Sequence, residues 1–189
     1  KFKTNYFFAV VTYGNIDGGA SNHFVKIAKK NNLDVKYIKS LLTVDTALPL
    51  FDIEKQVAKL DKKKTEENLQ QIVEDIHNRK TELNIGNSIK ATFSDMSYKM
   101  QVSMEKNKYK QFKVEDHCIG CKTCSKVCPV HNITMENNRP KYDTHCIGCF
   151  SCTNNCPVNA IRVKHERSKA RYRNKNVSVK EIIDSNNQN

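Results

Sequence analysis

Apolar residues in the first half of the chain gather in short blocks separated by polar ones. The block Tyr6–Val11 runs into Thr12-Tyr13-Gly14, which predicts a buried parallel strand that ends in a loop. Residues 15–21 are rich in Gly, Asn and Asp and predict that loop. Apolar residues then recur at helical spacing over 20–32, so we expect a helix there.

A second strand and a second helix follow the first pair. Residues 33–42 alternate loosely between apolar and polar, as in a strand, and Thr65 is placed to cap a helix that ends at Arg79-Lys80. The predicted core stripe of this helix consists of Leu69, Ile72, Val73 and Ile76. The order strand, helix, strand, helix predicts an α/β segment over residues 1–80 with a parallel sheet. Two strands do not make a stable sheet, so we expect a missing part upstream.

The pattern changes after residue 80. Residues 81–111 predict a polar connector, with the apolar residues Ile85, Ile89, Phe93, Met96, Tyr98, Met100 and Met104 scattered through it. Short strands are expected at Phe112–Val114, Ile133–Met135, Pro140–Tyr142 and Ala160–Val163, with short helices after Lys122 and Phe150. Residues 165–189 are expected to form a basic C-terminal tail, frayed at its end.

The eight cysteines form an internal repeat. All lie between Cys118 and Cys156, and each half reads C-x2-C-x2-C-x3-C-P at a constant offset of 28 residues. A disulfide framework would spread its bridges through the fold, so this crowding argues against one. Zinc sites use two C-x2-C pairs separated by a longer loop, which fits these runs poorly. The spacing instead favours iron–sulfur ligation.

Three cysteines at two-residue gaps place three thiolates on the inside of one tight loop. The fourth opens a helical turn that points away, so it ligates the other cluster. We therefore expect two [4Fe-4S] clusters: cluster one is held by Cys118, Cys121, Cys124 and Cys156, and cluster two by Cys146, Cys149, Cys152 and Cys128. Gly120 and Gly148 are expected to let the backbone approach each cube.

Three histidines lie beside the cysteine runs. His117 and His145 each precede the first cysteine of a run, and His131 follows the first Cys-Pro pair. Each is compatible with donation to a cluster sulfur or with a solvent-facing loop position. None is needed as an iron ligand, because eight thiolates complete both cubes.

Charge first suggests a nucleic-acid partner, since the chain has 32 Lys+Arg, 20 Asp+Glu and a formal net charge of +12. The basic residues are spread over every segment, however, with no stripe of interleaved aromatics, so no nucleic acid is expected. Each cube with its four thiolates carries about −2 when oxidised and −3 when reduced, which leaves about +8 or +6. No run of 18 apolar residues occurs, so no membrane span is expected either.

Residues 112–164 resemble the bacterial two-cluster ferredoxins, with both cysteine motifs complete. The resemblance implies a ferredoxin fold with a pseudo-two-fold axis and low-potential clusters. Typical members are acidic, whereas residues 118–164 carry 6 basic and 2 acidic residues. An acidic docking surface is therefore expected on the redox partner.

Residues 6–80 resemble the C-terminal half of the flavodoxin-like domain in bacterial flavodoxin–ferredoxin fusion proteins. The resemblance rests on Thr12-Tyr13-Gly14 and Asp75-Ile76-His77-Asn78-Arg79-Lys80, and Arg171-Tyr172-Arg173-Asn174 with Val177–Ile183 resembles that family's C-terminus. It implies an N-terminally truncated member in which Tyr13 and Gly14 would line the FMN edge. No phosphate-binding loop precedes them here, so a strand-end tyrosine without a ligand is the other interpretation.

The fold class expected is therefore α+β, a two-cluster ferredoxin fold preceded by an α/β partial flavodoxin-like segment. We expect a cytoplasmic electron carrier that relays single electrons between partner proteins, since reduced thiols are free for iron in that compartment. The alternative is a fragment of an FMN-dependent iron–sulfur oxidoreductase. No catalytic motif occurs in the sequence.

Overall fold

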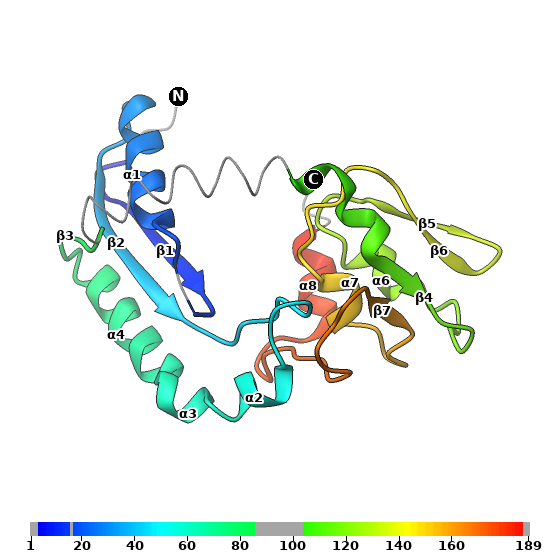
Figure 1. Cartoon of the computed structure of the whole chain (residues 1–189). Helices are drawn as coiled ribbons and strands as arrows, with labels where there is room; N and C mark the ends of the chain where they lie inside the picture. The colour runs from blue at the N-terminus through cyan, green and yellow to red at the C-terminus, as the bar shows by residue number, and fades with distance from the viewer. Residues whose placement is uncertain (1–3, 16, 86–103, 187–189) are drawn as a thin grey trace. The chain divides into compact units, whose positions relative to one another are not determined.

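The computed structural model describes residues 4–15, 17–85 and 104–186 and shows a mixed α and β protein (Figure 1). The chain divides into two compact units. The first comprises residues 1–45 and 58–100, and the second comprises residues 46–57 and 101–189. Most of the predicted connector, including Ile89, Phe93, Met96, Tyr98 and Met100, lies outside the described residues.

The first unit contains a parallel sheet of order β1-β2-β3. Strand β1 (Phe7–Tyr13) pairs along its length with β2 (Val35–Leu42), and β2 also pairs with β3 (Glu82–Leu83). The two longer strands and their parallel pairing were predicted from the sequence. The third strand was missed because a two-residue strand carries no periodic pattern.

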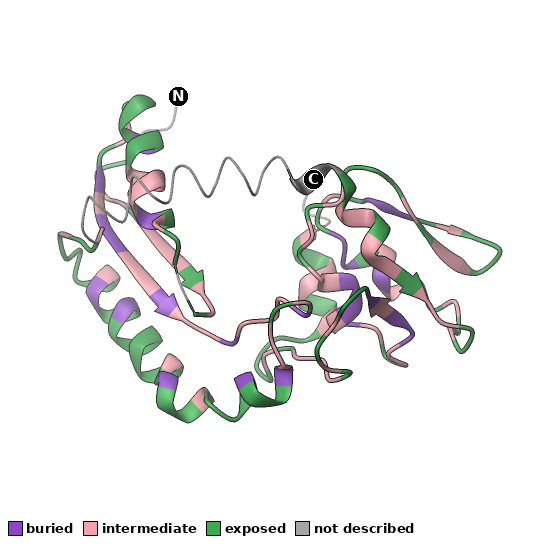
Figure 2. Ribbon diagram, in the orientation of Figure 1, coloured by how far each residue is buried: buried purple, intermediate pink, exposed green. Residues whose placement is uncertain are grey.

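Helices cover both faces of β2, where buried residues gather (Figure 2). Helix α1 (Ala20–Lys30) packs Ala28 against Ile38 on one face of β2. Helix α4 (Thr65–His77) packs Ile72 against the neighbouring residue, Tyr37, on the opposite face. Adjacent strand residues point to opposite faces, so β2 is the buried centre of the unit. A short helix, α3 (Leu60–Lys63), precedes α4.

Several details of the prediction for this unit are wrong. Strand β1 is half-exposed, with Phe8 at 44%, because it is an edge strand of the described sheet. In α4 only Ile72 and Ile76 pack on the sheet, whereas Leu69 and Val73 are 39% and 58% exposed. Thr65 does not cap the helix, because its hydroxyl donates to the Leu42 carbonyl instead, at 2.8 Å.

The second unit contains two short antiparallel strand pairs, of which one is a hairpin and the other joins the two ends of the cysteine-rich region. Strand β4 (Phe112–Val114) pairs antiparallel with β7 (Ile161–Val163), and β5 (Ile133–Glu136) pairs antiparallel with β6 (Arg139–Tyr142). Helix α6 (Thr123–Lys126) precedes one strand pair and α7 (Ser151–Asn154) precedes β7. These strands agree with the prediction to within one residue at each end, and the two helices begin directly after Lys122 and Phe150, as predicted.

Segments outside the cysteine-rich region complete this unit. They are α2 (Ile53–Val57), the 3-10 helix η1 (Met104–Gln111) and α8 (Val179–Asn186). Leu48 and Ile53 are buried against Val163, with Tyr172 packed beside them. The first part of the predicted tail therefore packs beside β7.

No helix among the described residues combines the length and apolar character needed to cross a membrane.

Candidate metal centre

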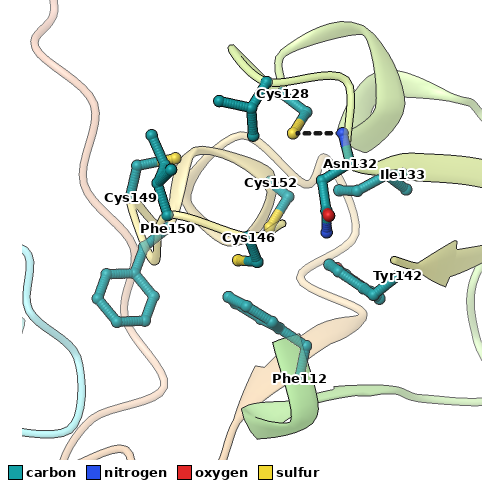
Figure 3. A pocket seen from close by; sticks show the side chains of 11 residues that line it. Phe112, Cys128, Asn132, Ile133, Tyr142, Cys146, Cys149, Phe150 and Cys152 are labelled. Carbon is teal, nitrogen blue, oxygen red and sulfur yellow. Dashed lines mark hydrogen bonds between the residues drawn. The ribbon is translucent and has the colours of Figure 1, made fainter. Parts of the chain in front are cut away.

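The eight cysteines are free thiols that converge on two cavities of the second unit. Cys118, Cys121, Cys124 and Cys156 line the first cavity, which encloses about 310 Å³ including its open mouth. Cys128, Cys146, Cys149 and Cys152 line the second, of about 300 Å³ (Figure 3). Each cavity thus takes three cysteines from one run and the last cysteine of the other.

Left-handed backbone conformations coil each cysteine loop. Gly120 and Gly148 have φ angles of 66° and 68°, and Lys122 and Phe150, which stand just before α6 and α7, have φ angles of 63° and 58°. Glycine adopts this region without the steric cost that a Cβ brings. The repeated turn brings the three cysteines of each run to the wall of one cavity.

Both glycines also stand close to other parts of the protein. A Cβ on Gly120 would stand 2.8 Å from the Asn138 carbonyl oxygen, and one on Gly148 would stand 2.6 Å from Cδ of Lys108. The left-handed backbone therefore favours glycine at both positions, and the backbone of Asn138 adds a steric reason at Gly120.

Backbone amides donate to the sulfur atoms in a repeated pattern. The amide of Asn132 donates to Cys128 Sγ at 3.3 Å, and the amide of Ala160 donates to Cys156 Sγ at 3.2 Å. Each donor stands four residues after its cysteine, so the duplication in sequence is a duplication in hydrogen bonding. Such donors stabilise negative charge on sulfur.

Burial keeps several of the thiols protonated in the absence of iron. It raises the pKa of Cys124 to about 11 and that of Cys152 to about 12, and it also raises the pKa of Cys146 and Cys149. At Cys121 burial acts in the same direction, but hydrogen bonding with Thr123 outweighs it and the pKa is lowered. Iron ligation requires thiolates, so loading these cavities releases protons.

The cavities coincide with a core of the unit. Cys124, Cys128 and Cys152 are buried with Ile133 and Ile161 in one cluster, and further apolar residues pack around it: Phe112, Val130, Met135, Tyr142 and Cys156. A second cluster of the unit, around Leu48, Ile53 and Val163, contains no cysteine, so the cysteine-lined cluster is one of two cores in this unit. Folding of this unit and occupation of its cavities are therefore coupled.

The donor set fits two [4Fe-4S] clusters. Each cavity offers four thiols, the number that such a cube takes from a protein. Within the described residues, no three Cys, His, Asp or Glu side chains are grouped closely enough to share one metal ion. A cube binds its cysteines around a larger body than a single ion does.

The histidines beside the cysteine runs bond to the backbone. His117 Nε2 lies 3.1 Å from the Val158 carbonyl, and His145 Nε2 lies 3.0 Å from the Val130 carbonyl. Of the two interpretations from sequence, these contacts favour the exposed loop position over donation to sulfur. His131 is exposed, with a φ of 49°.

Two polar residues of the second cavity were missed from the sequence. Asn132 and Tyr142 both line it, and the Asn132 Nδ2 and Tyr142 hydroxyl are buried without a hydrogen-bond partner among the described residues. A comparison of the two halves could have singled them out. At the 28-residue offset, Asn132 corresponds to Ala160 and Tyr142 to Val114.

Tyr13 and Gly14 lie at the carboxyl end of β1 in the first unit. The Lys63 ammonium donates to the Gly14 carbonyl at 2.8 Å and to the Thr43 carbonyl at 2.5 Å, joining the segments that follow β1 and β2. A Cβ on Gly14 would stand 2.3 Å from Cβ of Asp45, so glycine is needed here for close packing. These contacts do not test flavin binding.

Residues 110–157 match the family model of the 4Fe-4S dicluster domain. This segment is therefore a ferredoxin-type domain that binds 4Fe-4S clusters, with the electron-transfer role of that domain. No curated protein and no solved structure was found to match the chain.

Proposed function

We propose that the protein is an electron carrier in which two [4Fe-4S] clusters relay single electrons between partner proteins. Cluster one would be held by Cys118, Cys121, Cys124 and Cys156, and cluster two by Cys128, Cys146, Cys149 and Cys152. A cube changes its charge by one at each step and needs no substrate pocket. The protein supplies ligands, hydrogen bonds and partial burial, which set the potential.

The observation that carries the proposal is the pair of cavities, each lined by four cysteines in a three-plus-one grouping. The shared core supports it further, because Cys124, Cys128 and Cys152 belong to the same buried cluster and draw on both runs. Two redox centres that share one core would need no moving part to exchange an electron.

Exposure at each cavity supports exchange with an outside partner. Cys121 and Cys149 are exposed, as are Ile119 and Ile147, at 64% and 48%. These two isoleucines occupy equivalent places in the repeat, and each directly follows the first cysteine of its run. Each cluster would therefore have an apolar, accessible edge through which an electron can enter or leave.

The test is anaerobic purification followed by determination of iron, acid-labile sulfide and the EPR spectrum of the dithionite-reduced protein. We expect a brown protein with about eight irons per chain and the interacting signals of two reduced cubes. Stoichiometric zinc, or iron near zero after anaerobic reconstitution, would contradict the proposal.

We further propose a cytoplasmic location and a redox partner with an acidic surface. The segment 118–164 carries 6 basic and 2 acidic residues, and residues 165–189 carry 6 basic and 3 acidic ones. If these charges steer docking, the rate of electron transfer to an acidic redox protein falls as salt is raised. A rate independent of salt would contradict the acidic partner.

The alternative function is a fragment of an FMN-dependent iron–sulfur oxidoreductase. It is favoured by the parallel sheet of the first unit, because ligands of such sheets bind at the carboxyl ends of the strands, where Tyr13 and Gly14 lie. Titration of FMN into the purified protein tests it. Quenching of flavin fluorescence that disappears in Tyr13→Ala supports the alternative, and unchanged fluorescence rejects it for this chain.

A further inference from the structure

We infer that the two clusters differ in potential, because the buried side chains of Asn132 and Tyr142 donate hydrogen bonds to cluster two, whereas the corresponding positions beside cluster one carry no donor. The inference rests on the proposed function. It states that cluster two has the higher potential and holds the electron in the singly reduced protein. Its basis is an asymmetry between two otherwise repeated halves.

The Asn132 side chain is held in place by its oxygen, and its amide NH2 group has no hydrogen-bond partner among the described residues. The residue is 1% exposed, and its Oδ1 accepts a hydrogen bond from the His145 amide at 3.0 Å. A backbone N–H can donate only to the oxygen, so this contact determines which end of the side chain is which. The Nδ2 group is then the end without a partner among the described residues, in a residue that lines the second cavity.

Tyr142 brings a second unpaired donor to the same cavity. Its ring stacks on Phe112, with centroids 4.9 Å apart and planes 5° from parallel, which fixes the position of the hydroxyl. The hydroxyl oxygen is buried and forms no well-aligned hydrogen bond among the described residues, and it interacts with the Cys152 thiol of the same cavity. In Figure 3 both side chains extend toward the space beside Cys146 and Cys152.

Buried donors without partners are rare, because each costs the free energy of a lost hydrogen bond. Two in one cavity, beside four cysteines, are explained if an acceptor occupies that cavity. The sulfide and thiolate sulfurs of a cube are such acceptors and carry its negative charge. The donors would then be satisfied when the cluster is present.

The first cavity lacks these groups. The positions equivalent to Asn132 and Tyr142 are Ala160 and Val114, whose side chains carry no donor. The lining of the first cavity includes Met135, Pro140 and Ile161, which carry no donor, and Thr123, whose hydroxyl lies 3.3 Å from Cys121 Sγ. The backbone donors to Cys128 and Cys156 are, by contrast, the same in both halves. The two sites therefore differ in their side-chain donors: two buried ones, from Asn132 and Tyr142, belong to the second cavity, and the half-buried Thr123 hydroxyl belongs to the first.

A hydrogen bond to sulfur favours the more negative, reduced cube over the oxidised one and so raises its potential. In the singly reduced protein the electron should therefore reside on cluster two. We expect the ratio of the two singly reduced forms to be about tenfold or more, which corresponds to about 59 mV for a one-electron couple.

EPR-monitored redox titration of the wild-type protein and of Tyr142→Phe and Asn132→Ala tests the inference. Phenylalanine keeps the ring that stacks on Phe112, and alanine reproduces the residue of the other half at position 160. We expect two midpoint potentials in the wild-type protein. In each variant the higher midpoint falls and the lower one stays. The ratio of the two singly reduced forms then changes by about tenfold, which is about 59 mV. Tyr109→Phe, a tyrosine outside both cavities, is the matched control and should move neither midpoint.

The outcomes separate this inference from the function beneath it. Fewer than two clusters in the wild-type protein would contradict the proposed function itself. Two clusters with one shared midpoint in the wild-type protein would overturn the inference without any variant being needed. Two midpoints that stay in place, or that move together, in the loaded variants would overturn it as well.

Discussion

Cys128 and Cys156 each stand two residues beyond a short helix, and each lines the cavity of the opposite run. The grouping depends on the turn of the helix, which carries the fourth thiol away from the loop that presents the first three. A sequential grouping, with each run serving its own cluster, would use the same eight residues. Pairs of substitutions distinguish the two arrangements.

We predict that Cys128→Ala combined with Cys146→Ala leaves one intact cluster and about four irons per chain, because both residues belong to the second cavity. Iron analysis and EPR of the anaerobically purified protein measure this. The matched control is Cys128→Ala with Cys118→Ala, which removes a ligand from each cavity and should leave no intact cube. Equal iron content in the two double variants would contradict the exchanged grouping.

Gly120 and Gly148 occupy equivalent places but meet different neighbours. Alanine at either position carries the cost of a left-handed residue, about 1–2 kcal/mol. At Gly120 the added Cβ also meets a backbone carbonyl oxygen at 2.8 Å, whereas at Gly148 it meets the flexible side chain of Lys108. We therefore predict that Gly120→Ala destabilises the second unit more than Gly148→Ala.

Urea denaturation followed through the visible absorption of the clusters measures this difference. Equal midpoints for the two alanine variants would mean that the segment around Asn138 moves aside at no cost. The pair serves as its own control, since both variants introduce the same side chain at nearly the same φ.

At the scale of elements, α4 is held to β2 by a buried polar contact as well as by apolar packing. Asp75 is 6% exposed and accepts hydrogen bonds from the Tyr37 hydroxyl at 3.0 Å and from Gln71 at 3.1 Å, with the Lys80 ammonium at 3.4 Å. Burial by itself would raise the pKa of Asp75, but these hydrogen bonds outweigh it and lower the pKa. The ionised carboxylate therefore stabilises the folded unit.

We predict that Tyr37→Phe weakens the protection of β2 amides from hydrogen exchange at neutral pH, since a hydrogen bond to a charged group is worth about 1.5–3 kcal/mol. Because the pKa of Asp75 is lowered on folding, its stabilisation is complete above the usual value of about 3.9 and is lost as the pH falls below it. The difference in β2 amide protection between wild type and Tyr37→Phe should therefore become smaller as Asp75 is protonated at low pH.

Protection factors of the β2 peptide, which correct for intrinsic exchange rates, measure the effect at pH 7 and below pH 4. The control is Tyr6→Phe, which removes a hydroxyl bonded to the neutral Lys80 carbonyl at 2.8 Å. Because the Tyr6 hydroxyl does not bond to Asp75, the effect of Tyr6→Phe on β2 protection should be similar at the two pH values. A Tyr37→Phe effect that is the same at both pH values would contradict the role given to the carboxylate.

At the scale of the whole molecule, the two units have cores of different kinds. The first unit packs α1 and α4 against a parallel sheet with Tyr37 and Ile38 at its centre. The second places its cysteines in its own core. The free energy of cluster binding should therefore support the second unit alone.

We predict that removal of iron with a chelator, anaerobically, abolishes hydrogen-exchange protection in β4 to β7 and leaves it in β1 and β2. Hydrogen exchange with mass spectrometry measures both units in one sample. The untreated protein under the same buffer is the control. Parallel loss in both units would show that they fold together, and retained protection in β4 to β7 would show that the second unit has a sufficient apolar core.

The pattern of residues predicted the short strands of the second unit well, since β4 agrees with the prediction at both ends. It predicted β1 and β2 as parallel strands but not β3, whose two residues carry no period. Periodicity also predicted that Leu69 and Val73 are buried, but the described part of the chain covers only the face of α4 that carries Ile72 and Ile76. How wide a helix face becomes buried depends on the partner surface, which periodicity does not contain.

The sequence by itself determined the iron–sulfur character of the protein. Ligand type and spacing along the chain are local properties, and eight thiols in two tight runs have few other uses. Only the tertiary structure brought Asn132 and Tyr142 to the same cavity and left their donors unpaired there. Whether a polar group finds a partner depends on residues distant in sequence, so the difference between the two repeated halves became visible only in the folded chain.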